Sequence, residues 1–361
     1  MSDEAYSTII DAVLFLALVA VSAAIMSPAI TGHAAERSLS DRGLRELSAS
    51  TLVSLESERV DFFEYRVLGD VADAVAGAGG INATSDILYR DVTKALLGRG
   101  SRHRTVMDIA AGDAACQFLA GPGAIRLNPV TVEYDRAASE LIDRSIRSKL
   151  DRRYGYEFTL RWSPLAGVPF GGEVKAGRPH PAGALSSSTT VTMPYTTNIT
   201  MAVLANANAC DLQYLGQVVS EYNADADSLR LRQNIRQVTR GCLKNTTGLI
   251  VDEIWANTLG SYLYGSRLDP VQALKRFSNN ETLNSQALVF IDNNGRDLVA
   301  DLAIAGNADA IDRLSDAIAD DIIEGSMDAG GARSTILAWL HSRYTPSRAV
   351  AALSVWVEPY A

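Results

Sequence analysis

Hydrophobic and polar positions divide this chain into an apolar start and a longer mixed body. The run from Ala12 to Ile30 contains no charged residue, and Ile9 and Ile10 extend it toward the N-terminus. A bilayer core about 30 Å thick needs roughly 20 mostly apolar helical residues, and residues 9–30 reach that length. No later segment does. The pattern predicts one N-terminal transmembrane helix that anchors the rest of the chain.

Two other interpretations of this apolar run remain open. A cleaved secretory signal would use Gly32–Ala35 as a small-residue cleavage site, but such a signal has a basic start and a shorter apolar core. Here the start is Ser2-Asp3-Glu4. A buried helix of a soluble domain would need neighbours on all its sides. A retained anchor fits the pattern best.

The first part of the body alternates between helical and strand periodicities. Helices are predicted over Phe62–Ala76, Ser85–Leu97 and Tyr134–Arg153, and residues 99–132 are expected to be irregular. Residues 50–55 fit either a strand or a continuing helix. Three strands follow the third helix, and short connections join them into a small antiparallel sheet with helices on one face. These strands are Tyr156–Trp162, Glu173–Lys175 and Ser188–Met193.

The second part of the body is mainly helical. Apolar residues recur every three or four positions, as expected for helices that bury one face. The predicted helices are Met201–Asn223, Ser228–Leu259 with a break at Asn245–Gly248, Asp297–Glu324 and Ser334–Tyr344, and the predicted strands are Gln286–Ile291 and Ala349–Val357.

The predicted fold class is therefore α+β. It combines an N-terminal transmembrane helix, a small antiparallel sheet with packed helices, a mostly helical region and a C-terminal strand. The predicted domains are an anchor with a short leader at residues 1–35, an α+β extracytoplasmic domain at 36–196, and a mainly helical domain at 197–361 that ends in a β-strand.

Charge limits the classes of partner. The formal net charge is −9, with 21% charged and 47% hydrophobic residues. Nucleic-acid binding needs clustered Lys and Arg, so it is not expected. The basic-leaning helix 135–153 interleaves acidic and basic residues and predicts a solvated face.

The orientation signals conflict. Arg37, Arg42 and Arg45 follow the span and favour a cytoplasmic body under the positive-inside rule. N-x-Thr sequons act only on a translocated surface, and large domains translocate largely regardless of charge. We expect an extracytoplasmic body, and a cytoplasm-facing tether is the alternative. The candidate N-glycosylation sites are Asn82, Asn198, Asn245 and Asn280.

The chain has three cysteines and no C-x-x-C motif. Cys210 and Cys242 flank a helical stretch and form a candidate disulfide. The spacing alone does not bring their Cα atoms within bonding range, so small buried residues are the alternative.

The sequence contains no catalytic motif that we recognise. Its histidines, which are His33, His103, His180 and His341, lack the clustered spacing of metal ligands. Asp292–Asp297 shares acidic residues with calcium loops but lacks their closing glutamate, and its Asn-Gly pair predicts a turn. We predict no catalytic residue, no cofactor and no metal site, and we do not expect an enzyme.

Several short blocks carry a resemblance to known proteins. Ser7–Asp11, which runs directly into an apolar helix, resembles the start of a type IV pilin. Tyr156–Gly172, Thr189–Thr192 and Tyr344–Arg348 are similar to an uncharacterised archaeal family of single-pass, surface-directed proteins. That family is associated with type IV pilus or Tad-like secretion gene clusters. The resemblance covers the first 30 residues, roughly residues 140–195, and the C-terminus.

The resemblance implies a role in assembly. Asp11 would take the part of the pilin acid that neutralises a neighbouring subunit's N-terminal amine. The simpler interpretation is an acid near the membrane surface and the helix N-terminus. No Gly, Lys or Arg precedes the span, so a prepilin peptidase site is not predicted.

The implied function is an accessory or minor pilin-like component at the cell membrane that acts through protein–protein contacts. Its expected partners are the membrane and other subunits of the pilus or secretion apparatus. The alternative is a membrane-tethered surface enzyme or a ligand-binding receptor.

Overall fold

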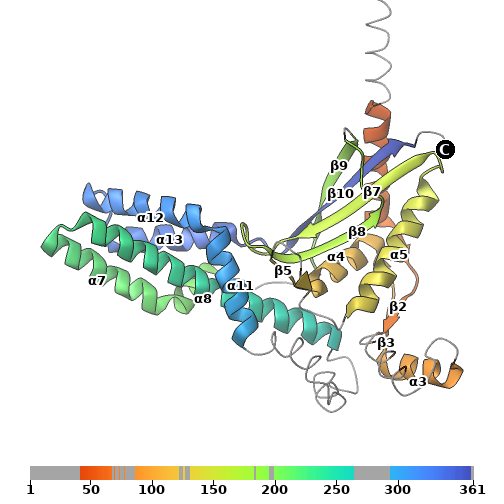
Figure 1. The fold of residues 1–361 in the computed structure, drawn as a ribbon, viewed down its shortest axis with the longest axis horizontal. Helices are drawn as coiled ribbons and strands as arrows, with labels where there is room; N and C mark the ends of the chain where they lie inside the picture. Colours follow the sequence, from red (N-terminus) through yellow and green to blue (C-terminus); the bar gives the residue numbers. More distant parts are fainter. Residues whose placement is uncertain are drawn as a thin grey trace, which may run out of the picture.

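The computed structural model describes residues 41–66, 69, 73, 77, 86–121, 125–126, 131–182, 184–194, 199–263 and 293–358. An antiparallel sheet with helices against one face forms one part of the molecule, and a group of long helices extends from it to one side (Figure 1). We call this group, α6 to α13, the helical arm.

The main sheet has the spatial order β6-β5-β8-β7-β10-β9, with antiparallel neighbours throughout. β10 comes last in the described chain and lies between β7 and β9, so that Leu353 is opposite Phe158 on one side and Ser187 on the other. The antiparallel sheet predicted from the alternating pattern is confirmed. Its strands are β5 (Leu119–Ala120), β6 (Ile125–Arg126), β7 (Tyr154–Trp162), β8 (Phe170–Gly177), β9 (Leu185–Thr192) and β10 (Arg348–Val357).

Helix α4 (Val106–Gln117) is buried on all sides beneath this sheet. Apart from Asp108, each of its residues is buried. It begins with a capping box, in which the Thr105 side chain accepts from the backbone N–H of Asp108 and the Asp108 carboxylate accepts from that of Thr105. Such reciprocal bonds satisfy two of the N–H groups that every helix start leaves open.

Small residues allow α4 to approach the sheet closely. A Cβ atom added at Gly172 of β8 would lie 1.8 Å from the carbonyl oxygen of Ala114. Only glycine fits such an approach of strand to helix backbone.

The prediction of irregular structure over residues 99–132 was wrong, because this stretch contains α4. A helix that is buried on every side has no polar face, so its sequence shows no apolar stripe of period 3.6.

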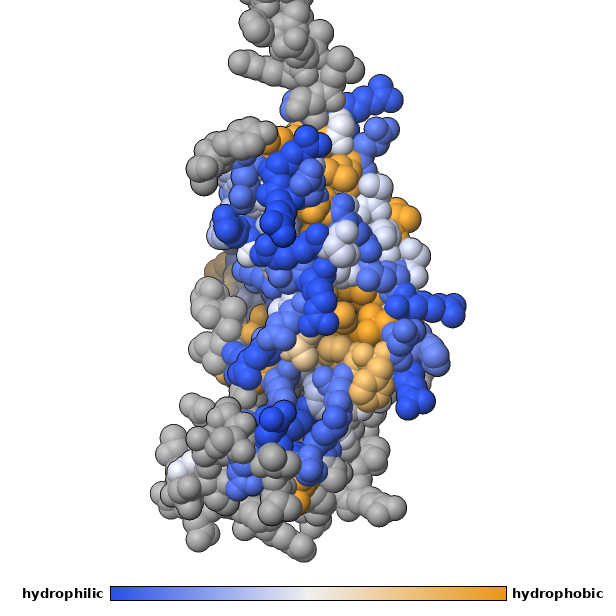
Figure 2. Space-filling model, turned by 90° about the vertical axis from the view of Figure 1, so that its right-hand side faces the viewer, coloured by the Kyte–Doolittle hydropathy of each residue, from blue (hydrophilic) through white to orange (hydrophobic). Residues whose placement is uncertain are grey.

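Two further helices cover the same side of the sheet. Helix α5 (Val132–Lys149) buries Tyr134, Ile142 and Ile146. Its Arg136, Glu140, Arg144 and Arg147 are exposed, as predicted for a solvated face. The side of the molecule that carries α5 is largely hydrophilic, with hydrophobic side chains gathered in a patch near its middle (Figure 2). Residues 41–57 form a helix that buries Leu52 and Leu55, which decides between the two interpretations of residues 50–55.

The predicted helix over Phe62–Ala76 was wrong at its start. Strand β2 (Phe63–Arg66) pairs with β3 (Gly98–Ser101), which follows α3 (Ile87–Leu97). The buried rings of Phe63 and Tyr65 meet the Tyr134 ring edge-on, at centroid distances of 5.2 and 4.5 Å. Two buried side chains separated by one residue are typical of a strand. The contacts of both rings with Tyr134 favour a strand over a helix at this position. β1 (Arg59–Val60) and β4 (Arg104–Thr105) form a second small pair.

The helical arm has six helices among the described residues, and α8 contacts α7, α11 and α12. The break predicted at Asn245–Gly248 was wrong, because α8 continues through it and buries Thr246 and Thr247. The predicted turn at residues 292–295 is also corrected, since α11 begins at Asn293. The predicted strand Gln286–Ile291 lies outside the described residues. The helices are α6 (Met201–Ala207), α7 (Ala209–Asp225), α8 (Ser228–Leu263), α11 (Asn293–Gly306), α12 (Ala308–Ile323) and α13 (Ala329–Arg343).

Ion pairs run along the contact that α8 makes with α11 and α12. Basic residues four positions apart on α8 face aspartates four apart on α12, and Arg236 and Asp312 approach to 2.7 Å. Pairs exposed to this extent each contribute about 0–1 kcal/mol, so their main effect is to select the partner helix and its register. The basic residues are Arg232, Arg236, Arg240 and Lys244, and their partners are Asp320, Asp316, Asp312 and Asp297.

A buried asparagine connects the arm to the sheet. Asn307 separates α11 from α12, donates through Nδ2 to the Ala303 carbonyl at 2.9 Å, and accepts from Arg343 of α13 at 2.8 Å. A Cβ atom at Gly167, in the β7–β8 connection, would lie 2.6 Å from the Asn307 side chain. Leu165 in the same connection bridges to Tyr344. The β7–β8 connection therefore docks on the arm.

The predicted fold class needs one correction. Within the described ranges, no helix combines the length and the apolar composition that a bilayer crossing requires. The longest described helix, α8, carries the charged stripe given above. The described class is therefore α+β, and the predicted transmembrane helix and the single-pass membrane description that came with it have no counterpart among the described helices. Residues 9–30, on which that prediction depended, lie outside the described residues. The division into domains at residue 197 stays a prediction.

A buried carboxyl group links α4 to α5. The Asp113 side chain is 0% exposed and accepts from Gln117 Nε2 at 3.1 Å, and the same amide lies 3.3 Å from Asp135 of α5. Arg126 donates to the other Asp135 oxygen at 2.6 Å. Burial, and then the neighbouring charge and hydrogen bond of Asp135, raise the pKa of Asp113 well above its usual range. Burial therefore favours the neutral acid over the carboxylate at Asp113.

We expect Gly172→Ala to lower the free energy of unfolding by about 3 kcal/mol, because the new methyl group meets the α4 backbone. Urea denaturation measures this. Gly216→Ala on α7 is the matched control, since a Cβ atom there has nothing within 4 Å; it should be neutral or stabilising by up to about 1 kcal/mol. Equal effects of the two substitutions would contradict the close contact.

We expect Asp113→Asn to flatten the fall of stability with pH. The pKa of Asp113 is about 3.9 in the unfolded chain and higher in the folded one, so its stabilising contribution is complete below the unfolded value. It is lost as the pH rises toward the folded value, by about 1.4 kcal/mol per pH unit. Urea midpoints at acidic and neutral pH measure the slope.

The control for this slope is Asp143→Asn, because hydrogen bonds lower the pKa of Asp143. Its effect should not depend on pH above the ordinary carboxyl range. The same slope in the wild-type chain and the Asp113→Asn variant would show that Asp113 is not held neutral.

Candidate functional site

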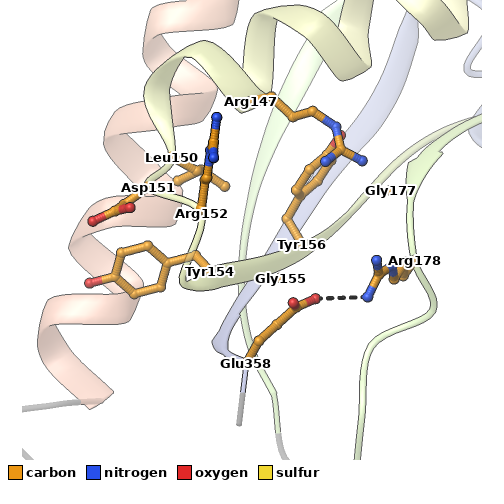
Figure 3. Close-up of a pocket in the computed structure, with 10 residues that line it drawn as sticks. All are labelled: Arg147, Leu150, Asp151, Arg152, Tyr154, Gly155, Tyr156, Gly177, Arg178 and Glu358. Atoms are coloured by element: carbon orange, nitrogen blue, oxygen red, sulfur yellow. Dashed lines mark hydrogen bonds and ion pairs between the residues drawn. The ribbon is translucent and has the colours of Figure 1, made fainter. Parts of the chain in front are cut away.

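An open hollow of about 370 Å³ lies where α5 ends and three strands of the sheet meet (Figure 3). We call it the arginine hollow. α5 and the turn after it form one wall, and the ends of β7, β8 and β10 form the other. The residues that line it are Arg147, Leu150, Asp151, Arg152, Tyr154, Gly155, Tyr156, Gly177, Arg178 and Glu358.

Two glycines shape the floor of the hollow. Gly155 of β7 is opposite Trp356 of β10, and a Cβ atom there would lie 2.4 Å from the indole ring. Gly177 ends β8 with φ +89°, and a Cβ atom there would lie 2.2 Å from the Tyr156 carbonyl. That carbonyl accepts from the backbone N–H of Arg178 at 2.9 Å. Glycine allows this left-handed conformation, which aims Arg178 at the hollow.

Tyr156 joins the strand wall to α5. Its hydroxyl donates to the Asp143 carboxylate, which also accepts from Arg147 Nε at 2.7 Å. The Arg147 guanidinium lies over the Tyr156 ring, 5.9 Å from its centroid. Burial alone would raise the pKa of Asp143, but the bonds from Arg147 and Tyr156 and the Arg147 charge keep it below its ordinary value. Burial, and then Asp143, raise the pKa of Tyr156, so this phenol stays neutral.

The charges of the hollow do not balance. Arg178 pairs with Glu358 at 3.1 Å. Asp151 is 3.6 Å from Arg153, which also lies over the Tyr154 ring at 4.8 Å. Arg152 is exposed and forms no ion pair with any other described residue. The hollow therefore presents a guanidinium that no described carboxylate pairs with, on a chain whose net charge is −9.

This arrangement suits recognition by contact. Arginine presents a planar fork of donors that matches carboxylate groups, and tyrosine offers a large rigid surface with a polar tip. Arginine, tyrosine and tryptophan are the residue types enriched where proteins bind one another. An open surface hollow also differs from small-molecule sites, which enclose most of their ligand.

His180 lies in the loop that crosses from β8 to β9 and contacts Glu157 of β7. The ring Nδ1 bonds the Glu157 carboxylate, which also accepts from the His180 backbone N–H at 3.1 Å. These bonds keep the pKa of Glu157 below its ordinary value. Both His103 and His341 are exposed, and His33 lies outside the described residues. No group of three potential metal ligands forms among the residues that the structure describes.

Most of the predicted modification and anchor residues lie outside the described part of the chain. These are Asp11, Asn82, Asn198 and Asn280. Asn245 is exposed on α8, and its amide donates to Asp211 at 2.8 Å. Thr247 of the same sequon is 1% exposed. Glycosylation at Asn245 stays a prediction, and a glycan there would have to be added before α8 packs.

The candidate disulfide between Cys210 and Cys242 is not formed. Cys242 is 0% exposed and faces the interior of the arm, whereas Cys210 is exposed on α7. Burial, and then the nearby Asp211 charge, raise the pKa of the Cys242 thiol to about 12. The alternative interpretation of Cys242 as a small buried residue fits this environment.

Sequence reasoning missed the arginine hollow. The hollow combines residues 147–156, 177–178 and 358, which come together only when β7 pairs with β8 on one side and with β10 on the other. The local signal was the run Arg152-Arg153-Tyr154, placed between a helix end and a strand start. Cations are also favoured near helix C-termini, which is the ordinary reason for Arg147 at this position.

The comparisons with known proteins identify a family and nothing more specific. A family model described as a family of unknown function, DUF7284, matches residues 10–226, which is more than half of the chain. The chain belongs to this family. No curated protein and no solved structure gave a significant match. The matched residues include α5, β7 and β8 but not β10, so Glu358 of the hollow lies beyond them.

We expect Tyr156→Phe to lower the free energy of unfolding by about 1–2 kcal/mol, because the buried hydroxyl donates to a charged carboxylate. Tyr154→Phe, two residues earlier in β7, should change the free energy of unfolding by less than about 0.5 kcal/mol. Its hydroxyl makes no hydrogen bond to another residue in the described ranges. Thermal denaturation of the two variants compares them directly, and equal losses would remove Tyr156 as the link between β7 and α5.

Proposed function

We propose that this member of the DUF7284 family is a protein-binding component that holds an acidic segment of a partner in the arginine hollow. It acts by contact and not by catalysis. The observation that carries the proposal is the exposed Arg152, which lies among Arg147, Arg178 and Tyr154 and forms no ion pair with another described residue.

Charge supports an acidic partner segment. The hollow is lined by three arginines and two carboxylates, and Glu358 is already held by Arg178. An acidic chain that keeps a basic hollow repels most acidic surfaces at long range and attracts a carboxylate at this one position. A bidentate bond from Arg152 would add direction to that attraction.

The geometry supports a segment of chain as the ligand. The hollow is open along the ends of three strands and lies beside half-buried Tyr154 and exposed Arg153. An extended segment can therefore lie across it and contact both the guanidinium groups and the rings. Binding of this kind depends on a few anchor residues and not on the total area buried.

The resemblance to pilus- and secretion-associated proteins suggests a class of partner, namely another subunit of such an assembly. An accessory role in that apparatus and an extracytoplasmic location are compatible with recognition by contact. Both stay predictions that no feature of the described body tests.

Binding of a labelled oligo-glutamate peptide, followed by fluorescence anisotropy, tests the proposal. We expect the wild-type chain to bind it and the double variant Arg152→Glu/Arg178→Glu to bind at least about tenfold more weakly, which corresponds to about 1.4 kcal/mol. The affinity should also fall as salt is added, since exposed charges are screened.

Arg333→Glu is the charge control, because Arg333 is exposed on α13 in the arm. It should leave peptide binding unchanged. Binding of an oligo-lysine peptide of equal length, which the net charge of −9 favours over the whole surface, should not weaken in the double variant. Equal binding by the double variant and the Arg333→Glu control would refute the role of the hollow.

A further inference from the structure

Strand β9 forms one edge of the main sheet and has features of a pairing surface. β10 occupies one side of β9 along its whole length, from Leu185 opposite Val355 to Thr192 opposite Arg348. On the other side, no described strand pairs with it. The backbone N–H and C=O groups of an edge strand are free to bond another strand.

β9 lacks the devices that usually prevent such pairing. Proteins protect sheet edges with charged residues, proline, bulges or very short strands. β9 has eight residues, none of them charged and none a proline. The outward-facing side chains Ser186, Ser188, Thr190 and Thr192 are exposed. A neutral edge is notable on an acidic chain, because it allows two copies to approach without local repulsion.

Two antiparallel copies of β9 would place residues of the same type opposite each other. Two copies that pair antiparallel about a two-fold axis at Ser188 would place Leu185 opposite Val191, and hydroxyl residues would face each other at every position between. This register keeps each side chain on its own face of the sheet, as strand pairing requires. Apolar pairs and Thr–Ser pairs are favourable cross-strand combinations.

The helix over residues 41–57 provides an apolar surface beside this edge. Ser48 and Glu56 hydrogen-bond the inward-facing Ser187 and Thr189 of β9. Ala49 and Val53 lie between these two contacts along the helix and are exposed, Val53 by 63%. Exposed apolar groups next to a free strand edge favour an occupant that covers both.

We propose that two copies of this chain associate through their β9 strands, which pair antiparallel about Ser188 and join the two sheets into one. The interface is isologous, as in most symmetric dimers. Eight strand residues bury less surface than stable dimers need. We therefore expect a weak association that depends on concentration and leaves the arginine hollow accessible for its own ligand.

Sedimentation velocity of the full chain, from about 1 to 200 µM, measures this association. The wild-type chain should shift from monomer toward dimer. Ser188→Lys and Ser188→Glu should each remain monomeric, because the axis brings two like charges together. An equimolar mixture of the two variants should dimerise again. Ser342→Lys, at an exposed position of α13, is the charge control and should behave as the wild type.

A cysteine substitution tests the register without adding charge. In a Cys210→Ser background, Ser188→Cys should form a disulfide-linked dimer on mild oxidation. Thr192→Cys should not, since its two copies would lie about 27 Å apart at about 3.4 Å per residue. A wild-type monomer at the highest concentration would overturn the proposal. So would dimerisation of both Ser188 charge variants alone, or equal cross-linking at positions 188 and 192.

Discussion

The contact between the backbone of β8 and that of α4 is the constraint on which the other parts of the structure depend. Gly172 allows the strand to reach the carbonyl of Ala114, and this contact sets the distance between sheet and helix. Because α4 is buried on every side, the sheet and α5 must pack around it. Side-chain changes elsewhere can be absorbed by repacking, whereas a backbone carbonyl cannot move away from a new methyl group.

The same central helix explains where charge is placed in the molecule. Asp113 is carried into the interior by α4, where burial and the nearby Asp135 raise the pKa of its carboxyl group, and it lies beside Gln117. Two clusters of charged side chains lie at the periphery. One is the stripe between α8 and α12, which aligns two helices, and the other is the arginine hollow, where Arg152 is left without a described partner. The two clusters differ in charge balance. In the stripe, each basic residue faces an aspartate, whereas the hollow has one arginine without a described acidic partner.

The hydrophobic pattern of the sequence predicted the elements that have one buried face, and it missed those that depend on distant contacts. Strands β7, β9 and β10 were predicted because each has one buried face, so its side chains alternate. α4 was missed because it is buried on every side and its sequence therefore shows no periodic pattern. Only Thr105 and Asp108 marked its start. At Phe63 and Tyr65 the apolar residues fitted both periods, and contact with Tyr134 decided for a strand. The hollow could not be predicted, because Arg152, Arg178 and Glu358 meet only after β10 enters the sheet. The predicted transmembrane helix has no counterpart among the described helices.

The position of β10 has a consequence for the order of folding. The strand at residues 348–357 separates β7 from β9, and the whole helical arm lies between β9 and β10 in the sequence. During synthesis, β9 has no partner in the sheet until the arm has left the ribosome. Contacts at such long sequence separation slow folding, because the chain must close a large loop before they form. The arm, whose helices contact mainly one another, is then the part that can form first and bring the ends of the sheet together.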